Sequence, residues 1–406
     1  MRLQILILLT FSTLTGIAQT KNDLYNEGLT HFRAENYSIA QEKFEEVLEL
    51  DATYHEAAYY LGRCYYEQQD YTRALEQFTL AVEHQEDFYP AWFYRGKTYH
   101  KKQEYDQALK DYTQAIEANS ELAAAYIERA RIYDEQEERQ KALTNYNKNE
   151  SLAGGSYGLY YNRARLLKRM GKYDKALSDA RKAIDLKPEN PEPFILRSRI
   201  FRKQRKYKKA VQEIENLLRV NSESEAAYQE RADLYFELEK YEKAMADYAT
   251  LANDFARRDI DIQYRLGICY AKLGNVMRAR RAFTKVISKD NDYADAYAQR
   301  AFVYLEMDKP SNAKQDLRKA LRKDDANATA WFLMGKLQAQ SHENEEALES
   351  LNKSLEKEHA GEAYALRARV KHRLKDHEGA CRDAKLAISF GYDKKEGQRD
   401  MNEFCR

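Results

Sequence analysis

Large apolar and small residues recur along the chain with a period of 34 residues. A segment that begins with Tyr followed by an acid and contains Ala three positions after the Tyr starts at Tyr105, Tyr173 and Tyr241, 68 residues apart each time. Within each period, large residues fall at position 4, small ones at position 8 and mostly Tyr at position 11, which is the spacing of one helical face. Ala at position 20 and a large apolar residue at position 24 mark a second helix. The pattern therefore predicts a repeated pair of helices.

Aligned at this period, the chain contains eleven units over residues 21–394, and all of them carry Ala at position 20. The small residues at positions 8 and 20 let the two helices of a unit approach closely. The tail, residues 395–406, is expected to form a capping helix. The units are 21–54, 55–88, 89–122, 123–156, 157–190, 191–224, 225–258, 260–293, 294–327, 328–360 and 361–394.

This order of large residue, Gly or Ala, Tyr, Ala, and Phe or Tyr resembles the tetratricopeptide repeat, a helix-turn-helix unit of 34 residues. The unit 157–190 also carries the family's Pro at position 32, Pro188. Pro310 departs from the family pattern at position 17, and we expect it to open a helix. The resemblance implies an all-α, right-handed superhelical solenoid whose first helices line a concave groove. Neighbouring units would bury each other's faces, so stability would build up along the array.

Composition narrows the classes of partner. The 406 residues include 67 basic and 66 acidic side chains, which argues against a basic nucleic-acid binder or an acidic disordered chain. The charge is nevertheless segregated, because residues 21–156 hold 15 basic and 26 acidic side chains whereas residues 157–224 hold 18 and 8. A basic cluster at residues 202–209 could contact an acidic protein, anionic lipid headgroups or polysaccharide at the cell envelope.

The first 18 residues resemble a signal peptide. Arg2 precedes an apolar run from Leu3 to Phe11, and small residues lead up to a cleavage point after Ala18. The alternative is an uncleaved anchor helix. No later stretch approaches 18 apolar residues, so no transmembrane segment is expected in the mature chain. We expect an exported protein, periplasmic or envelope-associated in a Gram-negative bacterium, and export disfavours a nucleic-acid partner.

Charged residues inside the repeat vary together. Where position 7 is Arg, position 23 is almost always an acid, and where position 7 is apolar, as at Leu61, position 23 is uncharged, as at Gln77. A partly buried charge left alone would be costly, which favours structural ion pairs within a unit over arginines that grip a ligand. The expected pairs are Arg95 with Asp111, Arg163 with Asp179, Arg197 with Glu213, Arg231 with Asp247, Arg300 with Asp316, and Arg367 with Asp383.

Positions 5, 9 and 12 form another stripe of the first helix, which lines the concave groove in proteins similar to this one. Position 9 is basic in five consecutive units, and we call Arg63, Lys97, Arg131, Arg165 and Arg199 the basic ladder. Arg pairs with carboxylates in bidentate fashion and aromatic rings supply rigid contact area. The alternative is a solvated charged face. The candidate groove residues are Tyr59, Arg63, Phe93, Lys97, Arg131, Tyr161, Arg165, Lys168, Arg199 and Arg202. Beyond them the ladder ends, with Asp233, Ile268 and Phe302 at position 9.

Four cysteines divide into two kinds. Cys64 and Cys269 share position 10 and are expected to be buried, whereas a tail that folds back would bring Cys405 to Cys381 for a disulfide. The sequence contains no recognisable catalytic, cofactor or metal motif. His372 and His377 lack further ligands.

These features together predict a non-enzymatic scaffold that binds extended segments of a protein or peptide partner carrying acidic groups, with no cofactor. The alternative is a structural component of a cell-envelope secretion or outer-membrane assembly complex.

Overall fold

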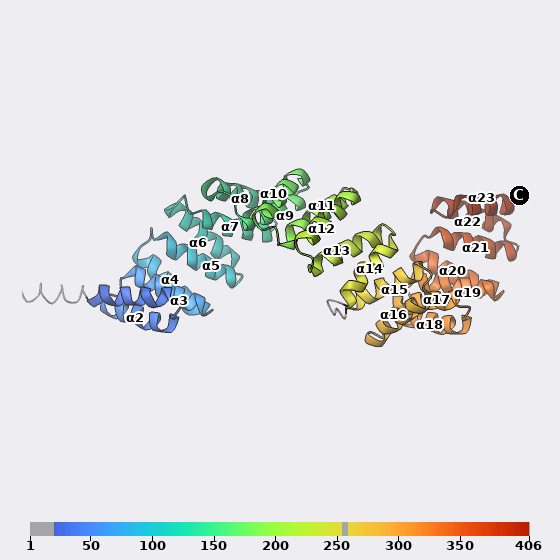
Figure 1. Ribbon diagram of the computed structural model, residues 1–406, viewed down its shortest axis with the longest axis horizontal. Helices are drawn as coiled ribbons and strands as arrows, with labels where there is room; N and C mark the ends of the chain where they lie inside the picture. The colour runs from blue at the N-terminus through green and yellow to red at the C-terminus, as the bar shows by residue number, and fades with distance from the viewer. Residues whose placement is uncertain (1–19, 254–258, 406) are drawn as a thin grey trace, which may run out of the picture. The chain divides into compact units, whose positions relative to one another are not determined.

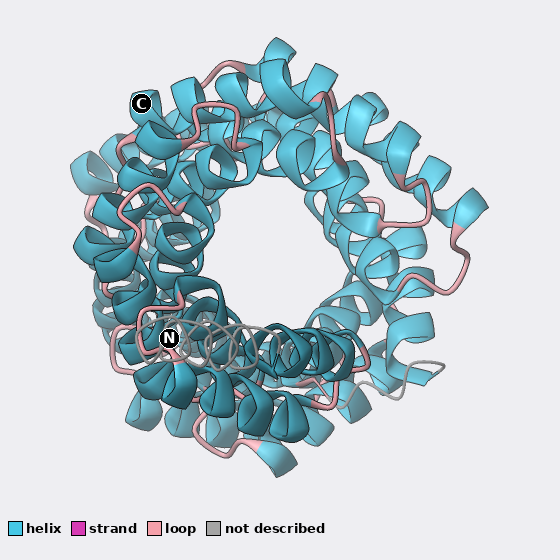
Figure 2. Ribbon diagram, turned by 90° about the vertical axis from the view of Figure 1, so that its left-hand side faces the viewer, coloured by secondary structure: helices cyan, strands magenta, loops and turns pink. Residues whose placement is uncertain are grey.

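The computed structural model describes residues 20–253 and 259–405. The expected signal peptide, residues 1–18, lies outside the described residues. The chain forms two compact units, Met1–Ile200 and Phe201–Arg406, which we call the first and second units and treat separately. Figure 1 labels the helices in chain order. The all-helical fold expected from the sequence is confirmed, because the described residues form helices joined by short loops and contain no strand (Figure 2).

Helices alternate between two kinds along the chain. The first helix of a pair begins at the residue where the sequence period begins, starting with a helix that includes residues 20–33. The others are α3 (His55–Glu67), α5 (Tyr89–Lys101), α7 (Ala123–Glu135), α9 (Tyr157–Arg169), α11 (Pro191–Lys203), α13 (Glu225–Glu237), α15 (Ile260–Lys272), α17 (Ala294–Glu306), α19 (Ala328–Gln340) and α21 (Gly361–Arg373).

The second helix of each pair begins at position 17 of the period. Pro310 is the first residue of α18, where its missing N–H costs no hydrogen bond. These helices are α2 (Tyr37–Leu50), α4 (Tyr71–His84), α6 (Tyr105–Ala118), α8 (Arg139–Ala153), α10 (Tyr173–Leu186), α12 (Tyr207–Val220), α14 (Tyr241–Asn253), α16 (Val276–Lys289), α18 (Pro310–Lys323), α20 (Asn344–Lys357) and α22 (His377–Ser389).

The turn inside each pair contains a residue with positive φ at position 15. Gly171 and Gly274 supply it in two turns, but other turns use residues with a side chain, such as Gln69 with φ of 65°. The N–H of Asp70 donates to the carbonyl oxygen of Tyr65 over 2.9 Å, which satisfies an otherwise unpaired carbonyl at the end of α3. The left-handed residue costs roughly 1–2 kcal/mol when it is not glycine, so the helix ends are held by the packing around them.

Small residues at position 8 accommodate the large side chain at position 24 of the same pair. A Cβ atom on Gly267 would lie 2.7 Å from the ring of Phe283, and one on Gly62 would lie 2.8 Å from Phe78. Both rings are fully buried. This close approach explains why position 8 is Gly or Ala in all repeats except 191–224, where it is the small Ser198, since a larger side chain would displace the ring.

Within each of the two compact units, successive pairs pack on one another, and the first helices also contact one another. Within the first unit α3, α5, α7 and α9 form such a row, and within the second unit α15, α17, α19 and α21 form another. Consequently positions 5, 9 and 12 of neighbouring first helices lie along the same side of the row in each of the two compact units.

The array ends in α23 (Lys394–Phe404), which packs against α22 and α21. Phe404 is 5% exposed and lies against Ala368, Ala380 and Ala384, with Met401 beside it. The amphipathic tail thereby covers apolar surface on the last pair, as expected of a cap.

Candidate functional site

The arginines at position 7 belong to the scaffold. Arg95 donates to Asp111 from two nitrogens, over 2.8 and 2.9 Å, and the Asp111 side chain is 2% exposed. The same two-nitrogen arrangement joins Arg163 to Asp179, Arg231 to Asp247, Arg300 to Asp316, and Arg367 to Asp383, each with a closest approach of 2.6–2.7 Å. Arg197 donates to the carbonyl oxygen of Leu177. Because these guanidinium groups are largely covered and already bonded within the scaffold, they belong to the packing of the repeats.

The same arginines reach back to the preceding pair, which the sequence analysis missed. Arg95 donates to the hydroxyl of Thr79 over 3.1 Å, and Arg163 donates to Asn147 over 3.0 Å, both at position 25 of the pair before. Arg129, Arg300 and Arg367 repeat the contact with Thr113, Thr284 and Asn352. The sequence carries a partial signal, since Thr or Asn stands at position 25 before five of the seven arginines, whereas Arg181 and Glu215 stand there before Arg197 and Arg231.

A pocket of about 370 Å³ lies between α9 and α11 in the first unit, and we call it the basic groove. Arg165 lies 5.8 Å from the centroid of the Tyr161 ring, which itself stacks on Tyr157 at 5.9 Å. Arg169 pairs with Asp134 from the preceding first helix. The pocket is lined by Tyr161, Arg165, Lys168, Arg169, Glu192, Ile195, Leu196 and Arg199. Four of these eight residues are basic and one is acidic, so the groove favours anionic groups.

A second pocket, of about 460 Å³, lies along α5 and α7 in the same unit. The Lys97 ammonium lies 4.8 Å from the ring centroid of Tyr94 and 5.1 Å from that of Tyr66. Burial lowers the pKa of Lys97, although Glu128 acts in the other direction. Arg131 is paired with Glu128 over 2.7 Å, so this pocket has more balanced charge than the basic groove.

Three of the expected groove residues are placed differently from the expectation. Tyr59 is 7% exposed and lies edge-on against Phe88 and Tyr94 in the hydrophobic core, so its ring offers no groove surface. Arg63 is held between the rings of Phe32 and Tyr94, with its guanidinium 4.7 and 4.5 Å from their centroids. The aromatic residues of the first pairs therefore fill the core and cover cations. Phe93 likewise packs on Tyr94 and Tyr112.

Arg202 belongs to the second unit, where it forms an ion pair with Glu237 of α13. Arg169 and Asp134 form the equivalent contact in the first unit. In both, position 12 of one first helix meets position 13 of its neighbour, so this contact helps to align first helices.

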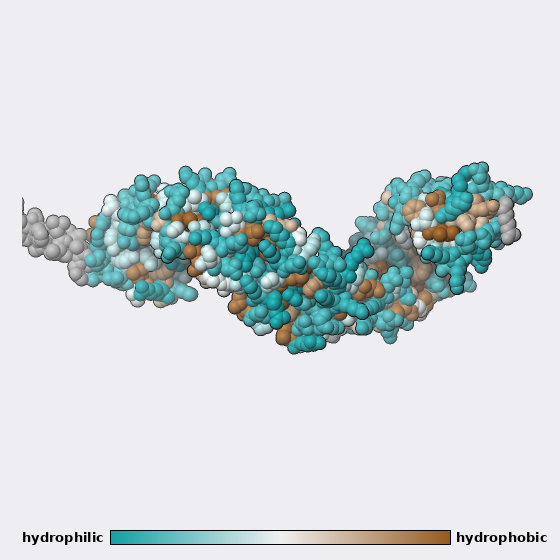
Figure 3. Space-filling model, turned by 90° about the horizontal axis from the view of Figure 1, so that it is seen from above, coloured by the Kyte–Doolittle hydropathy of each residue, from teal (hydrophilic) through white to brown (hydrophobic). Residues whose placement is uncertain are grey.

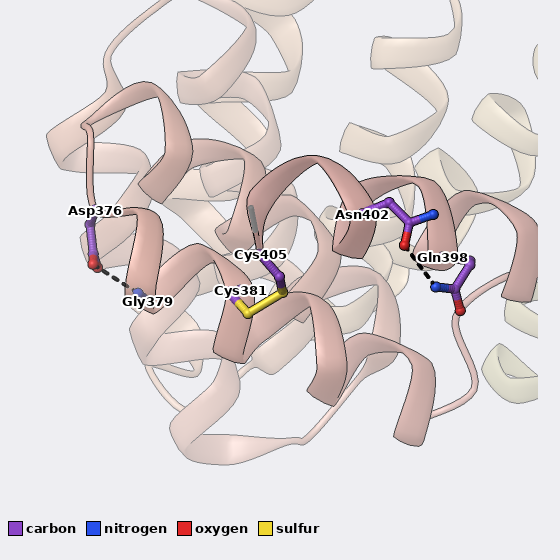
Figure 4. The surroundings of a disulfide bond; sticks show 6 residues. All are labelled: Asp376, Gly379, Cys381, Gln398, Asn402 and Cys405. Atoms are coloured by element: carbon purple, nitrogen blue, oxygen red, sulfur yellow. Dashed lines mark hydrogen bonds between the residues drawn. A yellow bond between two sulfur atoms is a disulfide. The ribbon is translucent and has the colours of Figure 1, made fainter.

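A disulfide joins Cys381 of α22 to Cys405 at the end of α23 (Figure 4). Beside it, the N–H of Gly379 donates to the Asp376 carboxylate that caps α22. Arg369 of α21 also holds the cap, at 2.9 Å from Asp400. Cys64 and Cys269 are free and buried, and burial raises the pKa of each thiol to about 12. They are therefore protonated and unreactive at neutral pH.

The described part of the chain contains no group of three or more His, Cys, Asp or Glu side chains that could hold a metal ion. His372 and His377 approach to 3.3 Å through their Nδ1 atoms. None of the helices formed by the described residues combines the length and the apolar character that a bilayer-spanning helix needs.

The paired helices and their interlocking small and large residues define a helical repeat protein, and comparison with family models identifies the repeat. Models described as tetratricopeptide repeat match residues 25–90, 195–261 and 299–363, residues 89–122 and 158–190, and residues 261–290. These matches cover more than half of the chain, which therefore belongs to the tetratricopeptide repeat family.

The chain is similar to solved structures at low sequence identity, and one of them reaches a TM-score that shows the same fold. The APC/C hetero-tetramer Cut9-Hcn1 is 14% identical, with 98% of this chain and 99% of that chain covered and a TM-score of 0.50. A tetratricopeptide repeat protein from Parabacteroides merdae is 20% identical over 70% of this chain and 99% of its own, with a TM-score of 0.43. Neutrophil cytosol factor 2 from Bos taurus is 42% identical over 55 residues, which are 14% of this chain and 10% of that protein.

Proposed function

We propose that this protein is a non-enzymatic scaffold that binds an extended, acidic segment of a partner protein in the basic groove of its first unit. The observation that carries the proposal is the convergence of Arg165, Lys168 and Arg199 on one pocket, in which Glu192 is the one acidic lining residue and Arg169 is already paired with Asp134. Guanidinium groups bind carboxylates in bidentate fashion, and Arg165 is held in place against an aromatic face.

The neighbouring residues supply contact area beside the charges. Tyr161 and Ile195 are partly exposed in the same pocket, so apolar side chains of the bound segment would pack there. Because the attraction is between surface charges, the affinity should fall as the ionic strength rises. The segment would thus alternate acidic and apolar residues.

The test is fluorescence anisotropy with a labelled, end-blocked peptide in which Glu alternates with Leu and Tyr. Arg165→Glu combined with Arg199→Glu is expected to weaken binding at least tenfold. The matched control is Lys175→Glu with Arg181→Glu on the exposed side of α10, which changes the net charge of the first unit equally. Equal losses in both variants would mean that net charge alone attracts the peptide, and the proposal would fail.

We also propose export to the periplasm or cell envelope. The leader-like residues 1–18 support export, and the pairing of Cys381 with Cys405 fits an oxidising compartment. Fractionation of the native cells, followed by thiol trapping without reductant, tests both points. Recovery in the cytoplasm with free thiols would overturn the proposal.

The alternative is a structural component of an envelope assembly complex that uses its outer surface. Leu186 and Val220 favour it, because they end second helices and are 51% and 55% exposed. Under this alternative, Arg165→Glu with Arg199→Glu would leave co-purification of the assembly intact, whereas Leu186→Glu with Val220→Glu would disrupt it.

A further inference from the structure

We propose that the second unit contains a separate binding site, which we call the apolar pocket, for a protein segment with apolar residues between an acidic end and a basic end. The pocket has a volume of about 530 Å³ and is formed by the row of first helices α15, α17, α19 and α21 with the loop before α23. This second site goes beyond the proposed function, because the basic groove belongs to the first unit and has different chemistry.

The apolar pocket uses the stripe that carries the basic ladder in the first unit. Ile268 and Phe302 occupy position 9 of their helices, and Phe332 occupies position 5. In the sequence, Ile268 and Phe302 lie beyond the end of the basic ladder. In the structure Ile268, Phe302 and Phe332 are partly exposed in one pocket of the second unit, so apolar side chains occupy part of this stripe there.

The loop before α23 contributes an aromatic side chain, Phe390, that is held in place by two neighbouring rings. Phe390 is 46% exposed, and its ring stacks on Tyr364 at 5.3 Å and on His359 at 5.4 Å. The hydroxyl of Tyr364 in turn hydrogen-bonds to Nδ1 of His359 over 2.8 Å. A large exposed apolar ring that is fixed before binding loses little entropy on contact, which is typical of anchor positions. The face drawn in Figure 3 is mostly hydrophilic with separate apolar patches.

The charged side chains that line the pocket come from different ends of the first helices, because Lys272 ends α15 and Lys336 lies in the second half of α19, whereas Glu362 lies in the first turn of α21. Lys272 of α15 and Lys336 of α19 line one part, and within the described residues neither ammonium forms an ion pair. Glu358 at the end of α20 and Glu362 in the first turn of α21 line the other part, joined by Asp393, whose carboxylate caps α23. A bound segment that is acidic toward the lysines and basic toward the carboxylates would complement both ends.

This charge distribution favours a protein segment over an acyl chain. A fatty acid could pair its carboxylate with Lys336, but its tail would then extend toward Glu358 and Glu362 and desolvate them without compensation. The volume is in the range of about 300–1,000 Å³ that ligand pockets commonly have. The occupant we assign is therefore a segment with the order acid, apolar residues, base.

The test uses end-blocked, fluorescein-labelled peptides and the full chain. The peptides Asp-Ser-Leu-Phe-Leu-Ser-Lys and Lys-Ser-Leu-Phe-Leu-Ser-Asp cover both chain directions, and a third replaces Leu-Phe-Leu by Ser-Ser-Ser. We expect one of the first two to bind at least tenfold more tightly than the Ser peptide. Failure of both to bind, or displacement by laurate but not by unlabelled peptide, would overturn the assignment.

Charge reversal tests the orientation. We call whichever of the two Asp/Lys peptides binds the bipolar peptide. Lys272→Glu with Lys336→Glu should weaken its binding at least tenfold. The same variant should bind a peptide with Lys at both ends more tightly, because the pocket would then be acidic throughout. The control is Lys285→Glu with Arg318→Glu on the exposed sides of α16 and α18. Binding of the acidic peptide to the basic groove should be unchanged in both variants, so failure of this site and failure of the proposed function are distinguishable. If the variant and the control bind the bipolar peptide equally well, the assigned orientation of the peptide in the pocket is refuted.

Discussion

Nε of Arg163 lies 2.6 Å from Oδ2 of Asp179, and both side chains are 7% exposed. The same guanidinium reaches Asn147 and Glu150 of α8. One arginine therefore ties together both helices of its own pair and the second helix of the pair before. Because the same contact recurs in several helix pairs, it forms part of the interface on which successive repeats stack.

The first prediction concerns the cost of breaking such a pair. Arg95→Ala leaves Asp111 buried and unpaired, which should cost about 3–5 kcal/mol in the free energy of unfolding. Burial raises the pKa of the Asp111 carboxyl even with Arg95 present. Arg95→Leu with Asp111→Gln should cost far less, because residues 55–88 carry Leu61 and Gln77 at these positions. Urea unfolding of the three proteins measures the difference, and equal destabilisation would contradict the pairing.

The second prediction is that the stability contributed by Glu150 depends on pH. The hydrogen bond from Arg163 lowers the pKa of Glu150 to about 2 from its ordinary 4.5. Its stabilisation is thus fully present above pH 4.5 and is lost as the pH falls toward 2. Because the side chain is 31% exposed, Glu150→Gln should cost about 1 kcal/mol or less at pH 7. Thermal midpoints of wild type and variant should converge below pH 3; a gap that stays constant from pH 7 to pH 3 would exclude this mechanism.

The third prediction concerns the small residue at position 8. Gly267→Ala places a Cβ atom 2.7 Å from the Phe283 ring, which should cost about 1–3 kcal/mol through overpacking. Gly158→Ala is the matched control, since its added Cβ meets nothing within 4 Å on helix α9. That substitution should be neutral or stabilising by up to about 1 kcal/mol. Circular dichroism melts distinguish them, and similar midpoints would show that the ring can move aside.

The sequence predicts the helices well because the repeat period constrains each boundary. α9 begins at Tyr157 and α15 at Ile260, where the periodic pattern places the starts of their units. The insertion near Asp259 and the shortened unit near Ala360 change the spacing without disturbing the pairs that follow. Local small and large residues decide the packing of each pair, so the fold follows from sequence alone.

The candidate site follows less completely, because residue type does not reveal which neighbour covers a side chain. Tyr59 has the spacing of a groove residue, yet Phe88 and Tyr94 bury it. Ile268 and Phe302 break the basic ladder, yet they line a pocket that depends on the stacking of four first helices. Both outcomes depend on contacts between neighbouring helix pairs, which the periodicity within one pair does not encode.

The last prediction concerns the cap. The disulfide between Cys381 and Cys405 spans 24 residues, and closing a loop of this length stabilises a fold by about 3 kcal/mol. Cys405→Ala should therefore accelerate hydrogen exchange of α23 amides about a hundredfold, while Arg369 and the buried Phe404 still favour the docked helix. A thiol reductant should produce the same change in the wild type and no further change in the variant. Exchange in α3 to α7 should be unaffected because stability is local in a repeat array. Unchanged protection of α23 in both experiments would show that its apolar face and the Arg369 ion pair suffice to hold the cap.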